Sequence, residues 1–227
     1  PLLYDDDLRG VRDTDEHIEI GGSATVTDLL ESPVLQAVFP DLYKHLKLVS
    51  STPIRNMATL AGNFVNASPI GDMTVWFLAL DAEITLGTQA PLPASPQSGV
   101  RRLQLKNLYL GYKQLSKEPD EIITAIHFPV PQRAAYAKFA SPASKYALVG
   151  VFVAKTGGGV RVAVTGAGTQ VFRVPALESA LAADFSPGAV TPGSVSADDL
   201  RSDVEASSEY RAHLITVMAR RAVEAAR

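Results

Sequence analysis

The stretch that decides the fold is ATLAGNFVNASPIGD, residues 58–72, followed directly by MTVWFLALDAEITL, residues 73–86. The first part mixes small residues, amides, hydroxyls and a proline. It is too polar for a core strand and too irregular for a helix, so it predicts a loop. Asp72 can cap a short apolar helix over MTVWFLAL, and AEITL then alternates as a strand. A polar loop framed by helices therefore needs an explanation.

The composition of the whole chain is that of an ordinary globular protein. Its 227 residues are 46% hydrophobic, with a formal net charge of -3 and no basic stripe, which argues against a nucleic-acid partner. No apolar run approaches the roughly 20 residues that cross a bilayer. The amino end, PLLYDDDLRG, is acidic, unlike a signal peptide. We therefore expect a cytoplasmic protein.

The chain contains no cysteine and four histidines. Without cysteine it cannot hold an iron–sulfur cluster, form a disulfide or use a thiolate, so any redox chemistry requires a bound cofactor. No two histidines have the i, i+3 or i+4 spacing of ligands on one helix, and the sequence therefore predicts no metal site. The histidines are His17, His45, His127 and His213.

Strand and helix signals alternate at the start of the chain. HIEIGG, residues 17–22, alternates like a strand. Thr25 and Asp28 have the spacing of a capping box and predict the start of a helix. Ser32 followed by Pro33 predicts the start of a second helix, since serine can cap and proline is tolerated in the first turn.

The next segments continue this pattern. DLYKHLKLV, residues 41–49, predicts a third helix that ends at SSTP, residues 50–53. Residues 87–100 are rich in Pro, Gly and Ser and predict an exposed excursion. Beyond it we expect a helix over LKNLYLGYKQL, residues 105–115, and a strand over DEIITAIHFPVP, residues 120–131.

From about residue 136 the pattern changes to β-hairpins. Two β-rich runs follow, KYALVGVFVAK at residues 145–155 and VRVAVTGAG at residues 160–168. They are joined by TGGG, whose glycines suit a tight turn. PALESAL, residues 175–181, predicts a helix with proline in its first turn. The chain closes with a long stretch, residues 207–227, whose apolar residues recur at helical spacing. Together these features predict an α+β fold.

The polar loop has the composition of an anion site. Gly62 allows close backbone approach, and consecutive exposed N–H groups would form a concave site for a diphosphate. Thr59, Asn63 and Ser68 add polar side chains, and Asp72 can accept from ligand hydroxyls or an N–H. Together these groups suit a dinucleotide. The residues alone leave open an ordered surface loop that satisfies its own turns, with Asp72 acting only as a helix cap.

Residues 54–86 resemble a segment of the FAD-binding subunits of the xanthine dehydrogenase and carbon monoxide dehydrogenase family. The segment reads IRNMATLAGNFVNASPIGDMTVWFLALDAEITL. The pattern of that family is I-R-N-x-x-T-I-G-G-N-x-x-x-A-S-P-x-x-D, then a helix, then L-D-A. Upstream, IEIGGSATVTDLLES is similar to the family's I-G-A-x-x-T-x-x-x-L step. Downstream, DEIITAIHFPVP resembles its E-I-I-x-x-I-x-x-P strand. KFASPASKYALVGV and SDVEASSEYRAHLITVMARRA resemble stretches of the carbon monoxide dehydrogenase-like medium chains.

This resemblance implies an FAD site and a role for each residue in it. The backbone of residues 59–63 would bind the FAD diphosphate, and Asp72 would contact the flavin side of the cofactor. Ile123 would lie against the isoalloxazine, Lys138 would add a positive charge nearby, and Tyr146 would shield the ring. As alternatives, these last three are a core strand residue, a solvated charge and a half-buried strand aromatic. The implied cofactor-binding residues are Thr59, Leu60, Ala61, Gly62, Asn63, Asp72, Ile123, Lys138 and Tyr146.

The sequence departs from the family pattern in two places. Ala61 replaces the first glycine of T-I-G-G-N, although alanine is the least obstructive substitute. Family members also begin with a subdomain whose A-G-G-T/H-D/S-L loop grips the diphosphate from the opposite side. Residues 21–23, Gly-Gly-Ser, belong instead to the later strand-to-helix step. We therefore expect the first half of the FAD site to be missing through truncation, to lie on another polypeptide, or to have been lost.

The resemblance implies two domains. Residues 1–132 would be the second subdomain of a PCMH-type FAD-binding domain. Residues 133–227 would form a small antiparallel sheet packed with helices, similar to the carboxy-terminal domain of the CO dehydrogenase flavoprotein.

The function implied is that of the electron-transfer subunit of a molybdenum hydroxylase-type oxidoreductase, with no catalytic acid or base of its own. Electrons would pass from an iron–sulfur small subunit through FAD to an external acceptor. Molybdopterin and [2Fe-2S] clusters would lie on the large and small partner subunits. The alternative is a non-catalytic structural or interaction subunit that keeps the fold but binds no flavin.

Overall fold

The computed structural model describes residues 5–226 except 15–16, 41, 48 and 89–98. The chain divides into two compact units. The first is built from residues 1–66, 81–110 and 114–130, and the second from 67–80, 111–113 and 131–227. Helices and antiparallel sheets occur in both, which confirms the expected α+β fold. The domain limits 1–132 and 133–227 stay a prediction.

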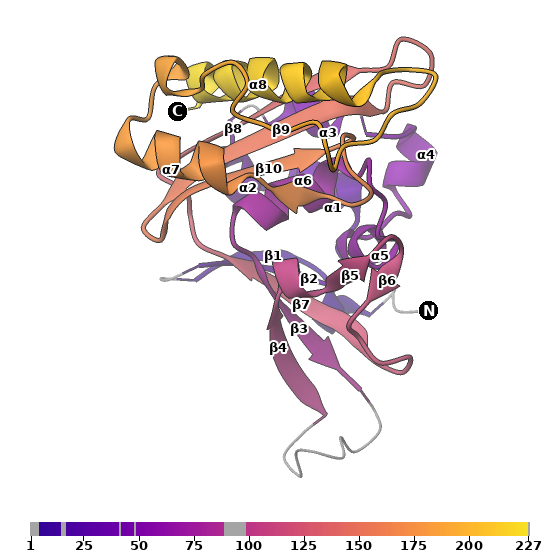
Figure 1. Cartoon of the computed structure of the whole chain (residues 1–227). Coiled ribbons are helices and arrows are strands. Elements are labelled where there is room, and N and C mark those ends of the chain that lie inside the picture. Colours follow the sequence, from indigo (N-terminus) through magenta and orange to yellow (C-terminus); the bar gives the residue numbers. More distant parts are fainter. Residues whose placement is uncertain (1–4, 15–16, 41, 48, 89–98, 227) are drawn as a thin grey trace. The chain divides into compact units, whose positions relative to one another are not determined.

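The first unit is built on a five-stranded antiparallel sheet with the strand order β1-β2-β7-β3-β4 (Figure 1). Short helices connect its strands. The strands are β1 (Val11–Asp13), β2 (Ile18–Gly21), β3 (Glu83–Gly87), β4 (Val100–Gln104) and β7 (Ile122–Phe128). The helices are α1 (Val26–Glu31), α2 (Pro33–Val38), α3 (Leu42–Leu46), α4 (Thr52–Arg55) and α5 (Leu60–Val65), with 3-10 turns at Asp6–Leu8 and Leu105–Asn107.

Two capping predictions in this unit are confirmed. The Thr25 hydroxyl accepts from the N–H of Asp28 at 3.1 Å, and the Asp28 carboxylate accepts from the N–H of Thr25 at 2.8 Å. Ser32 caps α2, in which Pro33 is the first residue. Both caps depend only on residues that are neighbours in the chain, so the sequence pattern was sufficient to predict them.

Two other predictions in this half of the chain are wrong. The stretch 105–115 forms a 3-10 turn and a two-stranded sheet of β5 (Tyr109–Gly111) and β6 (Gln114–Leu115), because the chain turns at Lys113, where φ is +54°. SSTP does not end a helix: Ser51 precedes α4 and Pro53 lies in its first turn. Most of the excursion predicted over 87–100 lies outside the described residues.

Gly22 is a position where the first unit leaves no room for a side chain. Its N–H donates to the carbonyl of Thr124 at 2.7 Å, and an added Cβ would lie 2.0 Å from the carbonyl oxygen of Ile123. We expect Gly22→Ala to lower the free energy of unfolding by about 2–3 kcal/mol, because backbone must move to relieve the overlap. Urea denaturation measures this change. Gly157→Ala is the control, since its Cβ would meet no atom within 4 Å; an equal loss in both variants would contradict the prediction.

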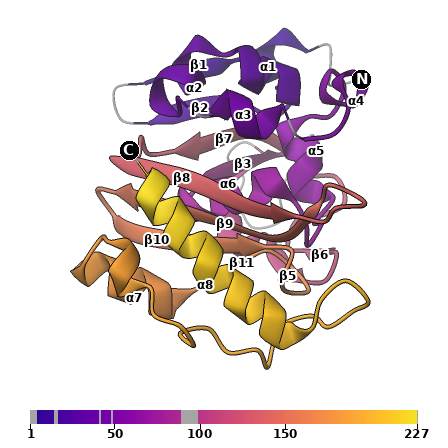
Figure 2. The same ribbon diagram turned by 90° about the horizontal axis from the view of Figure 1, so that it is seen from above.

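The second unit is built on a four-stranded antiparallel sheet with the order β11-β10-β9-β8. In Figure 2 helix α8 runs across this sheet, where it contacts β8 and β9. The predicted glycine hairpin is confirmed, since β9 and β10 pair from Thr156 and Gly159 onward and Gly159 has a φ of +110°. The elements are β8 (Arg133–Ala140), β9 (Ala147–Thr156), β10 (Gly159–Thr165), β11 (Phe172–Arg173), α6 (Asp72–Ala79), α7 (Pro175–Ala183), a 3-10 turn (Pro187–Ala189) and α8 (Ser208–Ala225).

The central strand β9 is covered on both faces. Val151 and Val153 belong to a core cluster with residues of α7 and α8 such as Leu177. Phe152 alternates with them and therefore points to the other face, where its ring lies 5.8 Å from that of Trp76 on α6. Two-sided burial explains why the sequence of β9 is a continuous apolar run.

None of the helices in the described part of the chain is both long and apolar enough to span a membrane.

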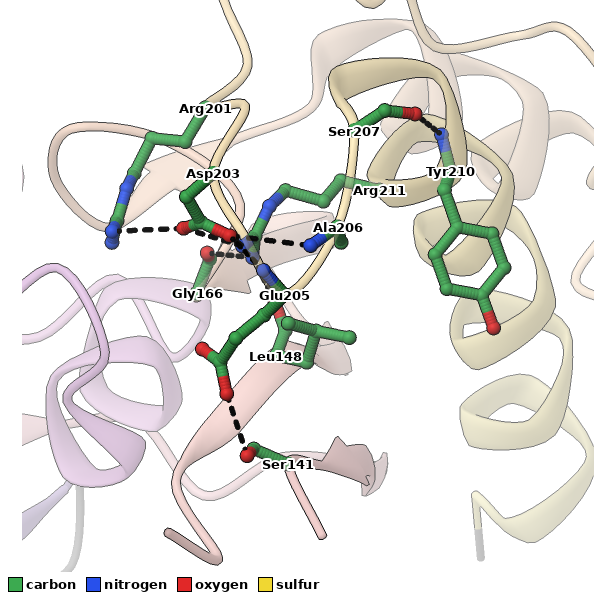
Figure 3. Close-up of polar contacts among 10 residues, drawn as sticks. All are labelled: Ser141, Leu148, Gly166, Arg201, Asp203, Glu205, Ala206, Ser207, Tyr210 and Arg211. Atoms are coloured by element: carbon green, nitrogen blue, oxygen red, sulfur yellow. Dashed lines mark hydrogen bonds and ion pairs between the residues drawn. The ribbon is translucent and has the colours of Figure 1, made fainter. Parts of the chain in front are cut away.

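A buried arginine connects α8 to the sheet of the second unit (Figure 3). The side chain of Arg211 is 2% exposed. Its Nη1 donates to the carbonyls of Leu148 and Gly166 at 2.8 and 2.9 Å, and its Nη2 contacts both carboxylate oxygens of Asp203 at 2.8 Å. Burial raises the pKa of Asp203, but hydrogen bonds from the N–H of Glu205 and from Arg211 outweigh it and lower that pKa below its usual value.

Candidate functional site

The stretch predicted as a polar loop contains a helix. Residues 60–65 form α5, and the Thr59 hydroxyl caps it by accepting from the N–H of Gly62 at 3.1 Å. Leu60 and Phe64 are fully buried on one side of this helix. Glycine and asparagine are poor helix formers, so the sequence indicated a loop. Tertiary burial of the two apolar residues decides the local structure.

The backbone N–H groups of residues 60–63 are not free donors. Two of them donate to the carbonyls of Ala24 and Gly22, at 2.9 and 3.3 Å. The other two donate to Thr59, one to its hydroxyl at 3.1 Å and one to its carbonyl at 3.0 Å. The expected cradle of exposed amides is therefore absent from this segment. Among the described residues the side-chain amide of Asn63 has no hydrogen-bond partner, so side chains rather than backbone suit a polar cofactor here.

Asp72 has a different role from the predicted helix cap. Gly71 is the N-cap residue of α6, and Asp72 is the first residue of the helix. One carboxylate oxygen of Asp72 accepts from the hydroxyl of Tyr136, and the other lies 2.7 Å from Nζ of Lys138. The Asp72 and Lys138 side chains are 9% and 12% exposed, so this is a largely desolvated ion pair. Burial, together with the Asp72 carboxylate, raises the pKa of Tyr136 well above its usual value.

Two features of the same sheet hold this cluster in place. Gly150 lies opposite Lys138 in the register, and a Cβ there would come within 2.3 Å of the Tyr136 hydroxyl. Glycine therefore makes the space that Tyr136 occupies. The loop before α6 is fixed by Thr165, whose hydroxyl donates to the carbonyl of Pro69 at 3.1 Å. The sequence pattern did not single out Tyr136, although its i, i+2 spacing from Lys138 in a strand places both on one face.

The remaining predicted residues have different environments. Ile123 lies in β7 and is 5% exposed, as a core strand residue would be. Lys138 is paired with Asp72, so the alternative of a solvated charge is wrong. Tyr146 precedes β9 and is 57% exposed, so it is not a half-buried strand aromatic. Residues 59–63 and Ile123 belong to the first unit, whereas Asp72, Lys138 and Tyr146 belong to the second.

Comparisons with proteins of known sequence give two kinds of relative. The xanthine dehydrogenase FAD-binding subunit of Escherichia coli O157:H7 is 32% identical over 124 residues, which cover 54% of this chain and 40% of that subunit. The carbon monoxide dehydrogenase medium chain of Afipia carboxidovorans is 29% identical over 243 aligned positions, which cover 97% of this chain and 78% of the relative.

Solved structures show the same likeness over nearly the whole chain. One chain in a crystal structure of Cu,Mo-CO dehydrogenase matches with a TM-score of 0.82 and 28% identity. The match covers 96% of this chain and 78% of that chain. Carbon monoxide dehydrogenase from Hydrogenophaga pseudoflava matches with a TM-score of 0.80 and 26% identity. These likenesses confirm the predicted fold class. Residues 6–131 match the family described as the FAD binding domain in molybdopterin dehydrogenase, and the chain belongs to that family.

Proposed function

We propose that this chain is the FAD-binding, electron-transferring subunit of a molybdenum hydroxylase-type oxidoreductase. The observation that supports this most is the family match over residues 6–131, joined to a likeness over 97% of the chain to a carbon monoxide dehydrogenase medium chain. Electrons would arrive from an iron–sulfur small subunit and leave to an external acceptor, beside a molybdopterin large subunit. The redox chemistry belongs to the flavin, and the protein supplies binding, orientation and electrostatics.

By the family resemblance, five of the described residues would have distinct tasks in FAD binding. The Thr59 hydroxyl and the Asn63 amide offer polar groups to the cofactor from the start of α5. Asp72 would accept a hydrogen bond from the flavin side, since a carboxylate that already has two partners retains acceptor capacity. Lys138 positions that carboxylate through the ion pair at 2.7 Å. The exposed ring of Tyr146 suits a role in shielding the isoalloxazine.

The remaining contacts would be apolar, because the backbone N–H groups of residues 60–63 already donate within the chain. Ile123 would supply an apolar wall for the ring system, and the small residues Ala61 and Gly62 would permit close approach at the diphosphate. The aligned residues account for 78% of the carbon monoxide dehydrogenase medium chain. The other donors to the diphosphate would then come from a subdomain outside the aligned residues, either in the same polypeptide or in another chain.

Removal of the Asn63 amide tests this proposal. We expect Asn63→Ala to lower the flavin content of the assembled oxidoreductase several-fold, because a side-chain donor to the cofactor is lost. Stability should not fall, since alanine is a better helix former than asparagine in α5. The measurement is the visible flavin spectrum and FAD content of the complex purified from its native host. Asn66→Ala, at the exposed end of the same helix, is the control.

A structural subunit without flavin is the second candidate function. It is favoured by the amides of residues 60–63, which already donate within the chain, and by Ala61 in place of glycine. The same purification separates the two functions. A complex that contains the iron–sulfur and molybdopterin subunits but no flavin would support the structural role. Flavin that is retained fully by the Asn63→Ala variant would remove α5 from the site.

A further inference from the structure

We propose that His17, Glu19 and His127 form a Zn²⁺ site on the five-stranded sheet of the first unit. No family resemblance suggests this site, and the spacing of the histidines in the sequence predicts none. The three side chains offer two imidazole nitrogens and a carboxylate oxygen that all lie within 4.8 Å of one another. Three protein ligands with one position left for water is a common arrangement around zinc.

The strand register brings these residues together. Glu19 on β2 lies directly opposite His127 on β7 in the antiparallel ladder. Side chains of directly opposed residues project to the same face of a sheet. His17 immediately precedes β2 and is two residues from Glu19, so the period of a strand returns it to that face. The cluster is therefore a product of sheet pairing between segments that are 110 residues apart.

Two of the three distances between the ligand atoms are close to those around a tetrahedral zinc ion, and the third lies within 4.8 Å. Nδ1 of His127 lies 3.3 Å from Nε2 of His17 and 3.6 Å from Oε2 of Glu19. Zinc–nitrogen bonds of about 2.0–2.1 Å and zinc–oxygen bonds of about 2.0–2.2 Å, at tetrahedral angles, place ligand atoms about 3.3–3.5 Å apart. A zinc ion can therefore replace the direct imidazole contact with only small side-chain movements.

Neighbouring groups orient the ligands. Nε2 of His127 lies 3.0 Å from the hydroxyl of Thr85, so that ring nitrogen has its own partner while Nδ1 faces the cluster. Arg12 donates to Oε1 of Glu19 at 2.8 Å, which leaves Oε2 on the side of His127. Hydrogen bonds of this kind fix the tautomer and the orientation of metal ligands.

The chemistry and exposure of the cluster favour zinc over hard cations. Two imidazoles and one carboxylate suit Zn²⁺, whereas Mg²⁺ and Ca²⁺ prefer oxygen ligands. The side chains of His127 and Glu19 are 9% and 27% exposed, so the cluster is partly open and an ion can enter. In the absence of metal, the same contacts are a hydrogen bond between the two imidazoles. An imidazole pair that binds no ion is the alternative that an experiment must distinguish.

Zinc titration of the full chain tests the site. The chain is prepared without a polyhistidine tag, stripped with a chelator and titrated with Zn²⁺ by isothermal calorimetry. We expect one equivalent to bind, and His17→Ala and Glu19→Gln each to weaken binding by about tenfold or more. His213→Ala is the matched control, because His213 is exposed on α8 in the other unit. Its affinity should equal that of the unchanged chain.

Two further variants separate ligation from folding. Substituting the buried His127 itself would disturb the sheet. The test therefore uses Thr85→Val, which removes only the hydrogen-bond partner of Nε2 of His127. This variant should weaken zinc binding by about tenfold while circular dichroism shows the fold intact. Co²⁺ should bind at the same site with the visible absorption of a four-coordinate ion. Absence of zinc binding, or binding that His17→Ala and Glu19→Gln leave unchanged, would show that the cluster is only an imidazole pair.

Discussion

Arg211→Met should destabilise the protein by about 3 kcal/mol or more, one of the two largest effects expected from a single substitution. The variant keeps most of the side-chain volume but removes the donors to the carbonyls of Leu148 and Gly166 and to Asp203. Removing one partner of a buried ion pair leaves the other groups uncompensated. The midpoint of urea denaturation, followed by circular dichroism, measures the loss.

The matched control removes the other arginine that contacts the same carboxylate. Arg201 lies 3.2 Å from Asp203, but its side chain is 38% exposed, so Arg201→Met should cost no more than about 1 kcal/mol. An Arg211→Met loss as small as that of the control would contradict the role assigned to Arg211.

Acid titration gives a second test of Arg211. The folded-state pKa of Asp203 lies below its usual value of 3.8. Its ionised form therefore stabilises the fold fully above pH 3.8, and this stabilisation is lost as the pH falls further. Arg211→Met removes one cause of the lowered pKa, so the variant should show a weaker loss of stability over this acid range. An unchanged slope against pH would contradict the pairing.

Asp72→Ala should destabilise the protein by about 3 kcal/mol. The substitution leaves the ammonium of Lys138 and the hydroxyl of Tyr136 without their acceptor in a largely buried environment. Asp199→Ala, at an exposed position of the same unit, is the control and should be within about 0.5 kcal/mol of the unchanged chain. A double-mutant cycle with Lys138→Met should give a coupling of about 1 kcal/mol or more. Zero coupling would contradict the ion pair.

If Asp72 contacts the flavin, as proposed, a second substitution at this position should affect the cofactor. Asp72→Asn keeps the shape and one acceptor oxygen but removes the charge. In the flavin-loaded complex it should weaken flavin binding or shift the flavin reduction potential. A variant that is silent in both measurements would leave Asp72 with a structural role alone.

The sequence by itself determined the features that depend on neighbouring residues. The capping box at Thr25 and Asp28, the glycine turn that ends at Gly159 and the long closing helix α8 are all in place. Each depends on hydrogen bonds or apolar spacing within a few residues, which a linear pattern contains in full. The segment 54–86 also indicated the family that the match over residues 6–131 confirms.

Only the tertiary structure decided the features whose partners are distant in the chain. Asp72 lies 64 and 66 residues from the partners of its carboxylate, and Arg211 lies 63 and 45 residues from the two carbonyls that it binds. Helix α5 forms because Leu60 and Phe64 are buried, not because its residues favour a helix. Local preferences are worth tenths of a kcal/mol to about one. Burying a large apolar side chain stabilises by about 1.5–3 kcal/mol, and removing one partner of a buried ion pair costs about 3–5 kcal/mol. The larger, non-local terms therefore set these positions, and they arise only once the strands have paired.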